Sequence, residues 1–416
     1  MSFERAPNAT SRADQTTVRH ANLGVVLQQI AGGAPRSRAG VAAETGLTRG
    51  TVSSLVGELI ELGLLRETGD DDRSGRVGRP AQTLELHDRI VAIGLQVNVD
   101  YLAVCVEDLT GAVRYERRVH TDNRRSKSGP VLDRLVRMAA KALDQVEAQG
   151  LTAVGTGVAL PGLVEVQTGI LLRAPNLGWS EIPVAAELAS RIGSLPVRAD
   201  NEANLAAVGE HWQGVARGLH SFICVFGEVG VGAGIFVDGE LFRGAHGFGG
   251  EFGHITVDHS GAPCVCGSLG CLETFVGQEA IAHRAGVSVG SGGRMRSITD
   301  ELVRRARAGD PAVLQSLAEA GRHLGVGLAS AVNLFDVDAV VLGGCFGPLA
   351  PWLVDEVSAM LHERVLSSTW SGCEVRVSEF GEAAAVRGAA ALMLRSVLAE
   401  PWAIADRHSS LTEVVS

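Results

Sequence analysis

The chain has 416 residues, of which 46% are hydrophobic, and this is more apolar material than one ordinary core holds. The formal net charge is −10 at pH 7, but arginines and acids balance over residues 1–86, so the acidic excess lies in the rest of the chain. No apolar run approaches the roughly 18 residues of a membrane span, and the polar N-terminus has no signal-peptide core. We therefore expect a cytoplasmic protein with reduced cysteines and no membrane contact.

The N-terminal part has the pattern of a DNA-reading domain. Residues 1–16 are polar and aperiodic, which predicts a disordered tail. Apolar residues at helical spacing follow, and Ser37 and Thr48 stand where they can cap two further helices separated by a glycine-containing turn. A helix, a short turn and a second helix form a helix-turn-helix, which we expect within 17–87. An ordinary three-helix bundle is the alternative.

Candidate DNA contacts come from the helix-turn-helix, including its capping residues, and from a predicted wing. The first residues of the second helix of such a pair lie against base edges in the major groove. Two runs that alternate like strands, 64–67 and 81–86, flank a polar arginine-containing loop and predict a wing, with a solvated linker as the alternative. We therefore expect double-stranded DNA to be contacted by Ser37, Thr48, Arg49, Thr51, Ser54, Arg76 and Arg79.

Two similar α/β halves follow the reader. Three strands joined by tight turns are expected between 90 and 119, and a second strand meander begins at residue 221. Each meander leads into alternating helices and strands. The repetition predicts a two-lobed α/β body with a ligand cleft, with lobes at 88–200 and 201–402 and a loose tail at 403–416.

Three cysteines and one histidine are spaced like metal ligands. Cys264, Cys266 and Cys271 fall within eight positions, and His254 precedes the first of them by ten. In a reducing compartment such a set favours a tetrahedral zinc ion over disulfides, with incidental cysteines as the alternative. The other four cysteines stand in apolar runs, which predicts core positions.

The same segment resembles the ROK family of repressors, open reading frames and kinases, and the resemblance extends over essentially the whole chain. It implies an actin-like, two-lobed sugar-kinase fold and a dimeric or tetrameric assembly. Together with the N-terminal reader, it is similar to the repressor branch of that family. The family's sugar-binding positions imply a sugar site made by carboxylates, amides and a histidine shared with zinc, namely Asn176, Asn201, Glu202, Glu251, His254 and Glu273.

The nucleotide side of the family kinases is altered in this chain. The strand end Gly94–Asp100 lacks the Asp and the Gly-Gly-Thr of the kinases' first phosphate loop. The second loop, Gly227–Gly234, keeps its glycines but has Glu228 where a threonine is usual, and a carboxylate repels a triphosphate. Asn201-Glu202 replaces Asn-Asp, which moves the base by a methylene. We therefore expect Glu202 to bind sugar without activating a hydroxyl.

Three functions are compatible with these features. The first is a sugar-responsive regulator without enzyme activity, acting as a homodimer or homotetramer on a palindromic DNA operator. The second is an active ATP-dependent sugar kinase that also carries a DNA-reading domain. The third is a regulator that responds to a protein partner. The altered phosphate loops favour the first.

Overall fold

The computed structural model describes residues 15–32, 36–68, 82–124, 126–193, 195–287 and 295–404. Its contacts divide the chain into two compact units, one made of 1–90 with 394–416 and the other of 91–393. Arg76 and Arg79, expected at the tip of the wing, lie outside the described residues. No helix of the described ranges is long and apolar enough to cross a membrane.

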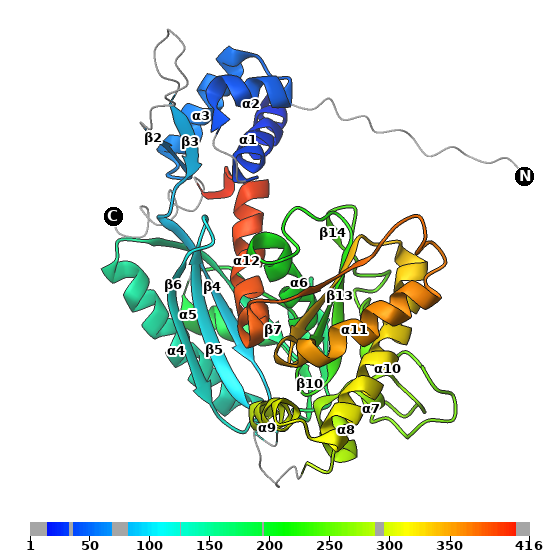
Figure 1. The fold of residues 1–416 in the computed structure, drawn as a ribbon. Coiled ribbons are helices and arrows are strands. Elements are labelled where there is room, and N and C mark those ends of the chain that lie inside the picture. The colour runs from blue at the N-terminus through cyan, green and yellow to red at the C-terminus, as the bar shows by residue number, and fades with distance from the viewer. Residues whose placement is uncertain are drawn as a thin grey trace, which may run out of the picture. The chain divides into compact units, whose positions relative to one another are not determined.

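The first unit contains the expected helix-turn-helix and two strands of a wing (Figure 1). Its elements are α1 (Gln15–Ala31), β1 (Arg36–Ser37), α2 (Arg38–Thr45), α3 (Arg49–Glu61), β2 (Leu65–Thr68) and β3 (Thr83–Leu86). The strands form one sheet in the order β1-β3-β2. Its buried apolar residues include Leu23, Leu27, Leu55, Leu59 and Leu84, which are spaced to face inward from α1, α3 and β3.

Local capping fixes the ends of α2 and α3. The Ser37 hydroxyl accepts a hydrogen bond from the Gly40 backbone N–H at 3.2 Å, and the Thr48 hydroxyl accepts one from the Thr51 N–H at 3.2 Å. The turn between the helices passes through Gly46 at φ 70°, a left-handed conformation that favours glycine. Both caps agree with the sequence prediction.

The second unit begins with a mixed sheet of order β11-β7-β4-β5-β6. Its strands are β4 (Ile90–Val97), β5 (Tyr101–Asp108), β6 (Val113–His120), β7 (Thr152–Leu160) and β11 (Val197–Asn201). Strands β4 to β6 form the expected antiparallel meander, and β11 runs parallel to β7. Apolar residues of α4 (Ser128–Ala148) and α5 (Val184–Ile192) pack in one core with this sheet, and Figure 1 shows both helices on one side of it.

A small antiparallel sheet of order β10-β9-β8 extends from the first lobe. It comprises β8 (Leu163–Glu165), β9 (Ile170–Ala174) and β10 (Trp179–Ile182). Leu171 and Trp179 are buried in the core of the first lobe, so this sheet is anchored by its inner face. Its position matters because residues 175 and 176, between β9 and β10, line a cavity.

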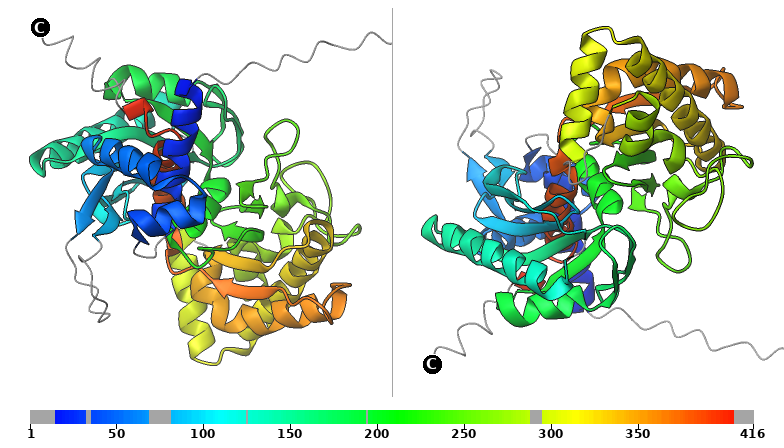
Figure 2. Two further views of the ribbon diagram at one scale, coloured as in Figure 1. Left: turned by 90° about the horizontal axis from the view of Figure 1, so that it is seen from above. Right: turned by 90° about the horizontal axis from the view of Figure 1, so that it is seen from below.

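The second lobe repeats the architecture with a sheet of order β14-β13-β12-β15-β16. Its strands are β12 (Phe222–Gly227), β13 (Val231–Val237), β14 (Glu240–Leu241), β15 (Ala339–Gly344) and β16 (Glu374–Val377). Helices α10 (Pro311–Phe335) and α11 (Phe346–Arg364), yellow and orange in Figures 1 and 2, share a core with one face of the sheet. The shorter helices beside them are α7 (Glu273–Val276), α8 (Gln278–Arg284) and α9 (Met295–Arg307).

Two helices, α6 (Glu202–Gln213) and α12 (Ala384–Ala399), cover the other face of the second sheet. Helix α12 also packs against the sheet of the first lobe. A Cβ added at Gly94 would overlap the carbonyl oxygen of Val386, and one added at Gly157 would overlap that of Ala389. The glycines are therefore required by close backbone approach between helix and sheet.

Three expected boundaries are wrong. The segment 201–402, predicted to be the second lobe, does not belong to one lobe alone. Its last helix, α12, packs against strands of both lobes. Residues from 394 onward group with the N-terminal unit. Helix α1 begins at Gln15, inside the predicted tail. At the other end Ile404, predicted to be loose, is buried with 2% of its surface exposed.

Candidate functional site

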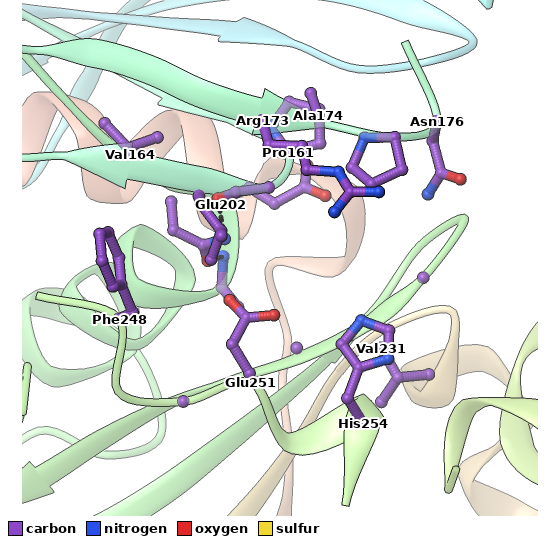
Figure 3. Close-up of a pocket in the computed structure, with 18 of the residues that line it drawn as sticks. Pro161, Val164, Arg173, Ala174, Asn176, Glu202, Val231, Phe248, Glu251 and His254 are labelled. Atoms are coloured by element: carbon purple, nitrogen blue, oxygen red, sulfur yellow. Dashed lines mark hydrogen bonds between the residues drawn. The ribbon is translucent and has the colours of Figure 1, made fainter. Parts of the chain in front are cut away.

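A cavity of about 330 Å³ is lined by residues of both lobes (Figure 3). The first lobe contributes strand ends and the small sheet, and the second lobe contributes the loop after β14 and the start of α7. All six residues expected at a sugar site line it: Asn176, Asn201, Glu202, Glu251, His254 and Glu273. The volume lies within the range of small-ligand pockets, of about 300–1,000 Å³.

Asn201 fixes the backbone that lines one side of the cavity. Its Oδ1 accepts hydrogen bonds from the backbone N–H of Ala203 at 2.7 Å and of Asn204 at 3.3 Å, which caps α6. Its Nδ2 donates to the carbonyl oxygen of Gly162 at 2.9 Å. The amide is therefore largely used by the main chain, and it positions Glu202, the next residue, at the cavity wall.

Glu202 lies beside a buried amide. Gln96 Nε2 donates to Glu202 Oε2 at 3.4 Å. Burial raises the pKa of Glu202 from 4.5 to about 7, and hydrogen bonds from Gln96 and Asn98 oppose this rise. The carboxyl group is therefore partly protonated near neutral pH and can donate as well as accept a hydrogen bond.

The opposite wall carries the remaining polar groups. Burial raises the pKa of Glu251, while His254 lowers it. The backbone N–H of Val231 donates to Glu273 Oε2 at 3.0 Å, which fixes that carboxylate. A Cβ at Gly230 would stand 2.7 Å from Glu273 Oε2 and 3.8 Å from Asn176 Nδ2, so the backbone there leaves space between two polar groups from different lobes.

The predicted metal ligands come together next to this wall. Ligand atoms of His254, Cys264, Cys266 and Cys271 all lie within 4.8 Å of one another. Cys264 Sγ is 3.6 Å from His254 Nδ1, and the sulfurs of Cys266 and Cys271 are 3.6 Å apart. A tetrahedral zinc ion with Zn–S bonds of about 2.3 Å requires ligand separations near 3.7 Å. The donor set and spacing therefore fit zinc, and His254 lines the cavity as well.

The turn that replaces the kinases' first phosphate loop is closed by its own hydrogen bonds. The Asp100 backbone N–H donates to Asn98 Oδ1 at 3.1 Å, and the Asn98 N–H donates to the Tyr101 carbonyl oxygen at 3.0 Å. The Asp100 carboxylate pairs with Arg124 at 2.7 Å. Phosphate loops need backbone N–H groups that point outward, and these two are already bonded within the turn.

A second cavity, of about 670 Å³, includes Glu228 in its lining. Its lining includes the carboxylates of Glu116, Glu228, Asp300, Glu379 and Glu382. Its two arginines are both paired, Arg118 with Glu382 and Arg387 with Glu107.

Glu228 is a buried carboxyl in the lining of this second cavity. The Tyr101 hydroxyl donates to its Oε1 at 3.4 Å, and the residue is only 6% exposed. Burial raises its pKa well above the ordinary value, and the nearby Glu202 carboxylate adds to the rise. The environment therefore favours the uncharged form of Glu228 more than that of an exposed glutamate.

The reader presents part of its expected DNA surface. Thr48, Arg49 and Ser54 are exposed at the start of α3, and Arg49 forms no salt bridge with any described residue. The Thr48 and Thr51 hydroxyls bond each other at 2.9 Å. Ser37 is half-buried and engaged in its cap. Arg49 is therefore the clearest candidate for contact with DNA in the described part of the reader.

Sequence reasoning missed three residues at the two cavities. Arg173 lines the first cavity, Gln96 donates to Glu202, and Tyr101 donates to Glu228. Arg173 stands three positions before Asn176, which was a usable signal. The partners of Gln96 and Tyr101 are more than 100 positions away, so no local pattern indicates them.

Two family models match this chain. The ROK family model matches residues 92–396, and the MarR family model matches residues 25–76. A protein of Caldicellulosiruptor sp. (strain Rt8B.4) named "Putative xylose repressor" is 30% identical over 92% of this chain and 98% of its own length. A solved ROK family transcriptional regulator, described as a homolog of the E. coli MLC protein, is 26% identical with a TM-score of 0.77, covering 92% of this chain and 97% of its own. A ROK family glucokinase from Streptomyces griseus, solved with glucose and AMPPNP, is 28% identical with a TM-score of 0.62, covering 73% and 98%.

Proposed function

The chain belongs to the ROK family, and we propose that it is a sugar-responsive transcriptional repressor that holds zinc and has no sugar-kinase activity. The contrast between the two sides of the body carries this proposal. The first cavity is lined by carboxyl, amide and imidazole groups suited to sugar hydroxyls, while the turn that would receive phosphate is closed by its own hydrogen bonds. The MarR-type reader and the relatives named as repressors support the regulatory role.

Sugar is held from both lobes in this proposal. Asn176 would contact the sugar from the first lobe, and Glu202 would contact it from the start of α6. Glu251 and Glu273 would contact it from the second lobe. A ligand bonded to both sides favours one lobe arrangement over others. A free-energy difference of about 1–3 kcal/mol between ligand-free and ligand-bound arrangements is enough to change operator affinity by 5- to 150-fold.

Zinc would be held by His254, Cys264, Cys266 and Cys271. The ion supplies structural stabilisation, worth roughly 10 kcal/mol or more in small zinc sites. The protein's own contribution is to orient the His254 ring. Because His254 Nδ1 faces the thiolates, the ring is fixed with its other edge toward the cavity that it lines.

A homodimer or homotetramer would present two readers to a palindromic operator. Arg49 and the exposed polar groups at the start of α3 would contact bases and phosphates. The positive end of the α3 helix dipole adds to the attraction for phosphate.

One observation favours a second candidate, an active sugar kinase. Glu202 stands at the position of the catalytic base, and a pKa of about 7 suits proton abstraction at neutral pH. A coupled ATP-consumption assay over hexoses, pentoses and N-acetylhexosamines separates the two. The repressor proposal expects no turnover, and measurable phosphorylation of any of these sugars would contradict it.

DNA binding is tested with the full chain. Double-stranded DNA is selected from a random library. The selected sequence is titrated by fluorescence anisotropy with and without each sugar of the same panel and its phosphorylated and uronate forms. We expect an inverted-repeat sequence whose affinity changes with one sugar. Failure to select any sequence would refute the DNA-reading role, and unchanged affinity with every sugar would refute sugar control and favour a protein partner.

A further inference from the structure

Arg173 is the one arginine among the described residues that line the first cavity. It stands on β9, one strand of the small sheet. Figure 3 shows its guanidinium extending over the cavity near Asn176, on the side opposite Glu251 and His254. Arg173 is exposed, so its charge faces both solvent and the cavity, and neutral sugar hydroxyls do not require a full positive charge.

The backbone that carries Arg173 is held firmly. In the sheet it pairs with Leu163 on one side and Ser180 on the other. A Cβ added at Gly162 would overlap the Arg173 carbonyl oxygen, so the two backbones touch closely. Asn201 in turn holds Gly162 by a hydrogen bond of 2.9 Å. The side chain therefore extends from a fixed strand and not from a loose loop.

The charge of Arg173 is available to a ligand. Within the described ranges, no carboxylate forms an ion pair with it, whereas both arginines of the second cavity are paired with glutamates. The carboxylates of the first cavity have other surroundings. Glu273 accepts a hydrogen bond from a backbone N–H, and Glu202 from Gln96.

We propose that Arg173 binds an anionic group on the effector, so that the ligand of this site is an acidic sugar carrying a carboxylate or a phosphate. This rests on the proposed sugar-binding function. The planar guanidinium fits either group by two parallel N–H···O bonds. The sugar ring lies against the carboxyl and amide groups, and its anionic group lies on the Arg173 side, away from Glu251. Partial protonation of Glu202 reduces repulsion of such a ligand.

Titration calorimetry on the full chain tests the proposal with series of related sugars. Each series contains a neutral sugar and its acidic forms: glucose, galactose, mannose and N-acetylglucosamine with their 6-phosphates, the three hexuronates, and xylose with its 5-phosphate. We expect one acidic form to bind about tenfold or more tightly than its neutral parent, as charge-assisted hydrogen bonds allow. Comparing the affinities of the hexuronates with those of the sugar phosphates shows whether the site prefers a carboxylate or a phosphate.

Substitutions assign the preference to this residue. R173Q is expected to weaken the acidic ligand about tenfold or more and the neutral parent by less than about threefold, while R173K keeps part of the preference because it keeps the charge. R137Q, a matched change at an exposed arginine of α4 that does not line the cavity, should change neither affinity.

Three results would overturn the proposal. One is a neutral sugar that binds as tightly as its acidic forms, and another is R173Q weakening both forms equally. Either leaves the sugar-responsive function standing. Absence of binding by every sugar of the panel would overturn the proposed function together with this inference.

Discussion

Replacing Glu202 by glutamine should remove a pH dependence from the stability of the body. The folded-state pKa of Glu202 is about 7, against 4.5 without the protein environment. Between those pH values the folded protein holds a proton that the unfolded chain has released, so stability falls as pH rises. The penalty is absent below pH 4.5, grows up to about pH 7 and is constant above it.

The magnitude follows from the shift. About 2.5 pH units at 1.36 kcal/mol each give roughly 3 kcal/mol, an upper value because the side chain is half-buried. For a unit of roughly 300 residues, an unfolding entropy of about 2.1 cal/mol/K per residue converts this to about 5 °C in Tm. As the pH rises from 5 to 8, the Tm of E202Q should therefore increase by up to about 5 °C relative to the Tm of the unsubstituted protein.

Differential scanning calorimetry at several pH values measures this effect. E147Q, at an exposed position on α4, is the matched control, since a solvated carboxylate has similar surroundings in the folded and unfolded chain. Its Tm curve should run parallel to that of the unsubstituted protein. If the E202Q curve is parallel as well, the environment assigned to Glu202 is wrong.

Three further substitutions address the reader, the metal and the packing. R49A should weaken operator binding by 1–3 kcal/mol, about 5- to 150-fold, with unchanged Tm, and anisotropy titration at fixed salt will show whether it does. C266S should lower both the Tm and the zinc content, which elemental analysis would otherwise find to be one ion per chain. C373S, outside the group, should keep its zinc. Equal zinc content in the two variants would argue against the four-ligand site. G94A should cost about 3 kcal/mol or more, since its Cβ meets the Val386 carbonyl oxygen, and a urea midpoint like that of the unsubstituted protein would disprove the close approach.

The helix-turn-helix could be predicted from the sequence because its signals are local. Ser37 and Thr48 cap helices within three residues of themselves, and the turn at Gly46 needs a left-handed conformation that glycine adopts easily. The cluster of His254 with three cysteines was predictable for the same reason, since the cysteines lie within eight positions, and the structure places the four ligand atoms within 4.8 Å of one another. The two meanders followed from alternating runs joined by tight turns.

The six residues expected at a sugar site could be named only through the family resemblance, because they are spread from Asn176 to Glu273. The fold brings all six to one cavity. It also changes how Asn201 is understood, since its amide is bonded to main-chain groups and mainly supports the floor of the cavity.

Tertiary structure alone decided the contacts between distant segments. Tyr101 and Glu228 meet across the two lobes, and α12 lies against two glycines that stand more than 200 positions earlier in the chain. The burial of Ile404, in the segment expected to be a loose tail, likewise depends on the folded structure. The physical reason is that a local pattern fixes which face of an element is apolar, whereas the partner of that face is chosen only when all elements pack together.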